Sequence, residues 1–172
     1  VASLTYSFDE LMSESPIEEP LIAGGVRCHG GYVGGEYVPP RSAVRRPAIE
    51  AWRQRLLDDG HRLIHVPEKH VPPNYPNYPQ AKFLLKEGVV EPVTRALTII
   101  SIVEGFGARI REVRVPDFAA EVKESVEGTA VAHLANGLFE AHARDEAGHR
   151  AEGGHKQMWE AARDLGLAKP HV

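Results

Sequence analysis

Acidic and histidine side chains interrupt two apolar stretches in the second half of the chain. Val93, Leu97 and Ile100 follow the four-then-three spacing of one helical face, and the next position on that face is Glu104. The surrounding positions are apolar nearly all round, so the pattern predicts a buried central helix. A carboxylate buried there is costly unless a cation or strong donors meet it, which makes Glu104 a candidate metal ligand. Gly105 and Gly107 flank it and permit close approach by a neighbouring backbone.

A second apolar stripe leads into a cluster of ionisable residues. Val131, Leu134 and Leu138 define this stripe, and continuing it by threes and fours meets His142, Asp145, Glu146 and His149. Glu146 and His149 are three residues apart, so on a helix both side chains point to the same side and can reach one metal ion. We therefore predict Glu104, Glu146, His149 and His142 as metal ligands. Hydrogen bonding from His142 to Glu146, without ligation, is an equally good interpretation.

A buried Glu followed by Glu-x-x-His resembles the ferritin-like di-iron carboxylate superfamily. Members of that superfamily build a four-helix bundle in which two helices each give a Glu and two each give Glu-x-x-His. In this resemblance Glu104 is the lone Glu, Glu146 the bridging Glu and His149 the histidine. The resemblance covers about residues 90–165, leaves residues 1–89 unexplained, and implies a di-iron or mixed Mn/Fe cofactor that activates dioxygen in an oxidoreductase, with a small molecule as substrate.

The chain holds only one half of that ligand pattern, since no second Glu-x-x-His follows His149. Three completions are open. Two chains could pair about a two-fold axis, which supplies each ligand twice and suits a di-metal site. A complementary half-chain could supply the rest. The site could instead hold one metal ion, with His142 or His155 as the additional ligand.

Two other functions use the same residues differently. The first is iron handling by a ferroxidase or storage protein, which needs the same ligands but a large assembly. The second is a non-enzymatic helical interaction domain, in which Glu104 is a buried acid paired with an arginine such as Arg109. The His-Glu-x-x-His motif of zinc proteases and the Gly-x-Ser-x-Gly motif of serine hydrolases are both missing from the sequence. The catalytic residues themselves cannot be assigned from the sequence.

The elements that must position these ligands form one predicted domain, residues 1–172. Residues 1–89 hold most of the prolines and paired glycines, which indicates an irregular wrap with short strands and short helices. Residues 90–172 form the ferritin-like helical part, so the expected fold is mainly α, with two long antiparallel helices whose bundle a second chain or missing half completes. The predicted helices are residues 47–59, 80–87, 91–113, 117–150 and 155–165, with Pro47 at a helix start and Gly60 just past an end.

Composition narrows the partners and the compartment. The 172 residues carry a formal net charge of −4, which gives no sign of a nucleic-acid partner. Cys28 is the single cysteine, so no intramolecular disulfide forms, which fits a reducing compartment. The acidic first residues do not resemble a signal peptide, and no apolar run is long enough to span a membrane. We expect a cytoplasmic protein with no membrane partner.

Overall fold

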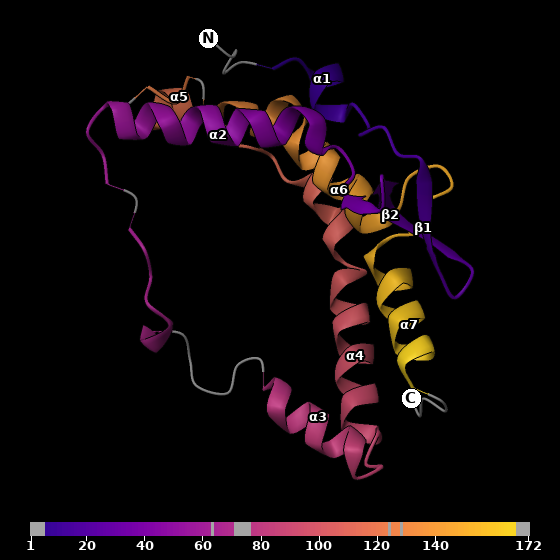
Figure 1. Cartoon of the computed structure of the whole chain (residues 1–172). Coiled ribbons are helices and arrows are strands. Elements are labelled where there is room, and N and C mark those ends of the chain that lie inside the picture. The colour runs from indigo at the N-terminus through magenta and orange to yellow at the C-terminus, as the bar shows by residue number, and fades with distance from the viewer. Residues whose placement is uncertain (1–5, 63, 71–76, 124, 128, 168–172) are drawn as a thin grey trace.

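The chain is mainly helical and carries one small antiparallel sheet (Figure 1). The computed structural model describes residues 6–62, 64–70, 77–123, 125–127 and 129–167. Its α-helices are α1 (Phe8–Met12), α2 (Ser42–Asp58), α3 (Tyr78–Lys86), α4 (Glu91–Glu104), α5 (Phe118–Glu121), α6 (Phe139–Ala147) and α7 (His155–Gly166). Its strands are β1 (Glu19–Ala23), β2 (Val26–Val33) and β3 (Glu36–Val38). Tighter or wider helical turns are η1 (Glu68–His70), η2 (Gly107–Glu112), η3 (Ala130–His133) and the π-helical η4 (Leu134–Leu138).

The sheet confirms the short strands expected in the N-terminal wrap. The strand order is β1-β2-β3, with β2 in the centre and both neighbours antiparallel to it. The middle of β2 is buried, including Cys28 and His29, because α7 packs against β1 and β2. The wrap therefore brings residues near the start of the chain against the C-terminal helix.

Helices α4 and α7 pack side by side and run antiparallel (Figure 1). Arg163 on α7 donates a hydrogen bond of 2.9 Å to the Thr98 hydroxyl on α4, and His155 at the start of α7 meets Glu104 at the end of α4. The side chains of α4 that this contact buries are small and polar, Thr94 and Ser101. Residues 117–150, which the sequence analysis paired with residues 91–113, are not the helix that lies along α4.

Neither of the two long predicted helices is continuous. The helix predicted over residues 91–113 ends at Glu104, with Gly105 as its C-cap, and the chain continues as the 3-10 turn η2. The helix predicted over residues 117–150 is divided into α5, η3, η4 and α6. Gly137 adopts a φ of 138° inside η4, a conformation that no α-helix contains, and this breaks the helix before α6.

The prediction that residues 91–113 form a buried central helix was also wrong. Thr94 and Ser101 face the interior, and Val93, Leu97 and Ile100 are half-buried, whereas four other large apolar side chains of the segment are at least half exposed: Ile99, Ile102, Val103 and Phe106. The other helical predictions agree better with the structure. α2 begins earlier than residue 47 and contains Pro47, while Gly60 adopts the left-handed conformation just past its end, with a φ of 82°. α3 and α7 match the predicted residues 80–87 and 155–165 to within two residues at each end.

Helices α2, α3 and α4 form three sides of an open frame (Figure 1). α3 has no buried residue. Among the described residues, no helix combines the length and the apolar character that a membrane span needs.

Candidate metal centre

Three side chains from three helices converge at the junction of α4, α6 and α7. The Nδ1 atom of His155 lies 3.1 Å from Glu104 Oε2 and 3.0 Å from Glu146 Oε1. One ligand atom from each residue lies within 4.8 Å of the others, the spacing that a single metal ion can bridge. The structure thus brings together two of the predicted ligands, Glu104 and Glu146, and adds His155, which the sequence left as an open alternative.

A tight reversal of the chain between α6 and α7 places Glu146 and His155 face to face. α6 ends at Ala147, and Gly148 turns the chain out of the helix with a φ of 84°, in a region that favours glycine. Seven residues later α7 begins, and the backbone N–H of Gly154 donates a hydrogen bond of 2.6 Å to the Gln157 side chain. Glu146 in the last turn of α6 therefore meets His155 in the first turn of α7.

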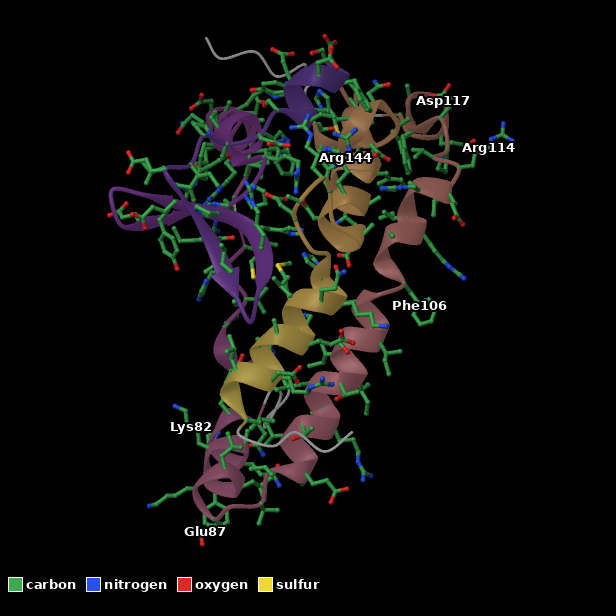
Figure 2. The ribbon with its side chains drawn as sticks, turned by 90° about the vertical axis from the view of Figure 1, so that its right-hand side faces the viewer. Lys82, Glu87, Phe106, Arg114, Asp117 and Arg144 are labelled. Atoms are coloured by element: carbon green, nitrogen blue, oxygen red, sulfur yellow. The ribbon has the colours of Figure 1, made fainter. Side chains whose placement is uncertain are left out.

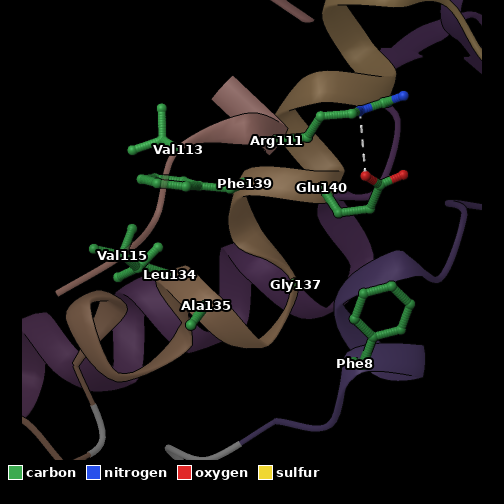
Figure 3. Close-up of a pocket in the computed structure, with 9 residues that line it drawn as sticks. All are labelled: Phe8, Arg111, Val113, Val115, Leu134, Ala135, Gly137, Phe139 and Glu140. Carbon is green, nitrogen blue, oxygen red and sulfur yellow. Dashed lines mark ion pairs between the residues drawn. The ribbon is translucent and has the colours of Figure 1, made fainter. Parts of the chain in front are cut away.

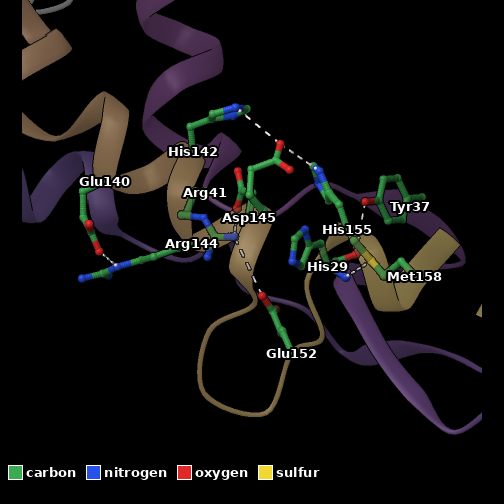
Figure 4. A network of polar contacts seen from close by, with 11 residues as sticks. His29, Tyr37, Arg41, Glu140, His142, Arg144, Asp145, Glu152, His155 and Met158 are labelled. Atoms are coloured by element: carbon green, nitrogen blue, oxygen red, sulfur yellow. Dashed lines mark hydrogen bonds and ion pairs between the residues drawn. The ribbon is translucent and has the colours of Figure 1, made fainter. Parts of the chain in front are cut away.

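The other two predicted ligands are placed differently. His142 is one turn before Glu146 on α6, and its Nε2 lies 3.4 Å from Glu146 Oε1 with half of the side chain exposed. His142 and His155 thus approach the Glu146 carboxylate together (Figure 4). His149 lies beyond the end of α6, so the helical three-residue relation to Glu146 does not hold. Among the described residues, the converging group does not include His149, whose ligation stays a prediction.

Gly107 allows the Glu146 carboxylate to reach this junction. A Cβ atom at position 107 would lie 2.3 Å from Glu146 Oε2 and 2.4 Å from its carboxyl carbon, far closer than any non-bonded contact permits. The sequence analysis noted that Gly107 permits close approach, and the structure shows that the approaching group is the side chain of Glu146. The first residue of η2 is therefore part of the wall of the site.

Three comparisons with known proteins found no match: one with protein-family models, one with curated proteins and one with solved structures. The chemistry of the junction therefore has to follow from its own donor atoms. Two carboxylates and one imidazole are a donor set that can hold a divalent metal ion.

The burial of Glu146 is the observation that best fits a cation. Only 6% of its side chain is exposed, and its Oε2 atom has no hydrogen-bond partner among the described residues. A buried and unpaired carboxylate oxygen is costly unless positive charge meets it. A metal ion held by Glu104, Glu146 and His155 would supply that charge.

His29 on β2 borders the site and was not singled out by the sequence. Its side chain is 5% exposed, its ring centroid lies 5.2 Å from that of His155, and its Nε2 has no hydrogen-bond partner in the described part of the chain. Burial, followed by electrostatic repulsion from the neighbouring His155 and Arg41, lowers the pKa of His29 to about 4, so the ring is neutral at physiological pH. Nothing in the spacing of residues 26–33 indicates this position, because the sheet and α7 create it together.

Arg41 fixes the chain reversal from the other side. Its guanidinium is almost fully buried, forms an ion pair with Asp145 on α6 and lies 3.8 Å from Glu152 Oε2 in the reversal (Figure 4). Burial is the main cause that lowers the pKa of Arg41, and the charge of Glu152 opposes it. Since Asp145 precedes Glu146 and Glu152 lies shortly before His155, one cation holds both arms of the reversal.

A separate small cavity of about 230 Å³ lies further along the η2 and α6 pair (Figure 3). Its walls are mostly apolar, and an ion pair of 3.4 Å between Arg111 and Glu140 crosses its edge. Glu140 precedes Glu146 by a helical rise of roughly 9 Å, so the cavity is close to the junction but does not contain its donor atoms.

Proposed function

We propose that this chain binds iron or manganese through Glu104, Glu146 and His155, with His142 beside the Glu146 carboxylate. The buried, unpaired Oε2 of Glu146 carries this proposal. Burying a charged oxygen without a partner costs free energy, and a bound cation would offset that cost. Two carboxylates and one imidazole on helices supply half of the ligand set of a ferritin-like di-iron or Mn/Fe centre. In that arrangement His155 takes the place that the sequence analysis gave to His149.

The proposed activity is dioxygen-dependent oxidation of a small molecule. Glu104, Glu146 and His155 would hold the ion, which in its reduced form would supply electrons to dioxygen, while the chain positions the ion and limits access of water. Glu104 and Glu146 neutralise the ion, while the neutral, buried His29 ring and Gly107 wall off solvent on two sides. We favour substrate oxidation over storage because His29 of the sheet adds a wall beside His155 that a storage subunit does not need.

The same distances also suit a different arrangement, in which a protonated His155 is shared between the two carboxylates. Such an ion triad binds no metal, and titration with metal ions separates the two cases. Under our proposal, the purified chain loaded with Fe(II) without oxygen retains a defined stoichiometry of metal after dialysis, measured by elemental analysis. Retention of no metal above a chelator-treated blank would leave the ion triad as the correct description.

Matched variants locate the site. Glu104→Gln and Glu146→Gln keep shape and lose charge, so we expect each to lower metal retention at least tenfold. Glu91→Gln at the other end of α4 and Glu140→Gln earlier on α6 remove the same charge away from the junction and are the controls. Equal loss in test and control variants would show a nonspecific effect of net charge.

Oxidation is tested on the Fe(II)-loaded protein by adding oxygen and following the near-ultraviolet and visible absorption. We expect a ligand-to-metal band that requires Glu104 and Glu146. If the spectrum of the metal-loaded protein does not change when oxygen is added, the proposed metal site stands and the proposed oxidation activity is refuted.

A further inference from the structure

The outward face of α4 is apolar, although the face that α4 buries is polar. Ile99, Ile102, Val103 and Phe106 are each at least half exposed and lie on the side opposite Thr94 and Ser101. Figure 2 shows Phe106 projecting outward from the α4–η2 junction, away from α7. Four large apolar side chains on one side of one helix form a contiguous patch, which in soluble proteins marks an interaction site. We call these four residues the α4 face.

The described core does not contain a comparable set of side chains. Its buried apolar residues are mostly small and few: Leu11, Cys28, Ala141, Ala143, Ala161 and Leu167. The largest side chains that are almost fully buried are polar, namely Arg41, Thr94 and Ser101. Phe83 on α3 and Ile49 on α2 are also more than half exposed. The hydrophobic residues that normally stabilise a domain of this size therefore point outward.

The exposed surface area of the chain is larger than that of a typical folded monomer of the same mass. The chain exposes 12,255 Å², whereas a folded monomer of its mass exposes about 8,300 Å². The excess is roughly 4,000 Å², and each subunit of a permanent homodimer buries ~1,000–2,500 Å². Part of this exposed surface is therefore enough for the contact area that a stable dimer with a second copy needs.

We propose that the α4 face is the contact surface of a two-fold homodimer, in which α4 of one chain packs antiparallel against α4 of a second copy. A two-fold axis places identical faces together, so one apolar helix face covers the other without a different polypeptide. The exposure of all four side chains leaves this face accessible. Glu91 and Arg95, which pair with each other, lie at one end of α4 and provide a polar edge.

This dimer does not depend on the metal centre. Glu104 follows Val103 directly in sequence, but its carboxylate meets His155 on α7, whereas the α4 face points away from α7 (Figure 2). The nearest further donor to the three converging ligand atoms is His142 of the same chain, 3.4 Å from the Glu146 carboxylate. The dimer contact and the metal centre can therefore be tested separately.

The test is the mass of the whole chain in solution, measured by light scattering and sedimentation over a range of protein concentrations. We expect a dimer in both the presence and absence of a chelator. Val103→Lys should weaken the dimer about 100-fold or more, since the two-fold axis loses two buried valines and gains two charges. Ile22→Lys is the matched control, because Ile22 on β1 is 62% exposed and Val103 is 63% exposed; it should leave the dimer intact.

A second measurement does not depend on how the lysine variant folds. Ile102→Cys should be joined to its counterpart by a short bismaleimide, whereas Ile22→Cys should not, and the buried Cys28 should stay unreacted. A wild-type chain that stays monomeric at all concentrations would overturn the proposal, as would an assembly that Val103→Lys leaves unchanged. A chelator-resistant dimer that retains no iron would refute the proposed metal function and leave the dimer standing, and a metal-binding monomer would do the reverse.

Discussion

At the scale of residues, the site depends on a contact that only glycine allows. Glu146 lies against Gly107 so closely that any side chain there would displace its carboxylate. The displaced acid would lose its distance of 3.0 Å to His155. Glu104, on the other helix, does not contact Gly107 in this way. The geometry of Glu146 is therefore set by a residue that ligates nothing.

Gly107→Ala should consequently weaken metal binding by about 10- to 100-fold, the usual effect of disturbing the support of a ligand. The measurement is Mn(II) affinity by calorimetry, with far-ultraviolet circular dichroism to show that the helices remain. Gly166→Ala is the control, because a Cβ there meets nothing within 4 Å. Mn(II) affinity equal to that of wild type in Gly107→Ala would show that Glu146 is not a ligand.

The sequence predicted the acids of this site better than the histidine. Glu104 and Glu146 stand out because each interrupts an apolar face, and burial of a charge is visible in a helical pattern. His149 was predicted as a ligand because α6 was expected to continue past Gly148, whereas the helix ends at Ala147. His155 and His29 reach the junction through tertiary contacts, and such contacts leave no periodic pattern in the sequence.

At the scale of elements, the reversal between α6 and α7 determines whether the acids and His155 meet. Local propensity predicts a break at Gly153 and Gly154, but it extends the preceding helix past Gly148 and does not predict the direction of α7. That direction depends on Arg41, which reaches from the start of α2 to both arms of the reversal. The helix predicted over residues 117–150 failed for a similar reason, because the left-handed backbone at Gly137 forms only where α1 packs against η4.

Arg41→Met tests this role in stability. The substitution leaves the largely buried carboxylates of Asp145 and Glu152 without their cation, so we expect unfolding free energy to fall by about 3–5 kcal/mol. Urea denaturation followed by circular dichroism measures the change. Arg95→Met is the control, because the Arg95–Glu91 pair on α4 is exposed and contributes at most about 1 kcal/mol. A similar loss in the two variants would show that Arg41 does not hold the reversal.

At the scale of the whole molecule, the centre joins three parts of the chain, of which α4 and α7 pack along each other while α6 meets α7 near the reversal. Glu104 belongs to the arm formed by α3 and α4, Glu146 to the η2 and α6 pair, and His155 to the helix that supports the sheet. The buried apolar residues are few, so packing alone stabilises these junctions weakly. An ion that binds all three side chains in the folded chain and not in the unfolded chain should stabilise the entire fold.

Mn(II) should therefore raise the thermal midpoint of the wild-type chain. At a concentration 100 times the dissociation constant the added stability is about 2.7 kcal/mol, which corresponds to a rise of about 5–10 °C for a chain of this length. Scanning calorimetry with and without Mn(II) measures the shift, at one fixed protein concentration because a dimer makes the midpoint depend on concentration. Glu104→Gln should lose the shift and Glu91→Gln, on the same helix, should keep it. An equal shift in both variants would mean that Mn(II) binds elsewhere on this acidic chain, because only Glu104 of the two lies within ligand distance of Glu146 and His155.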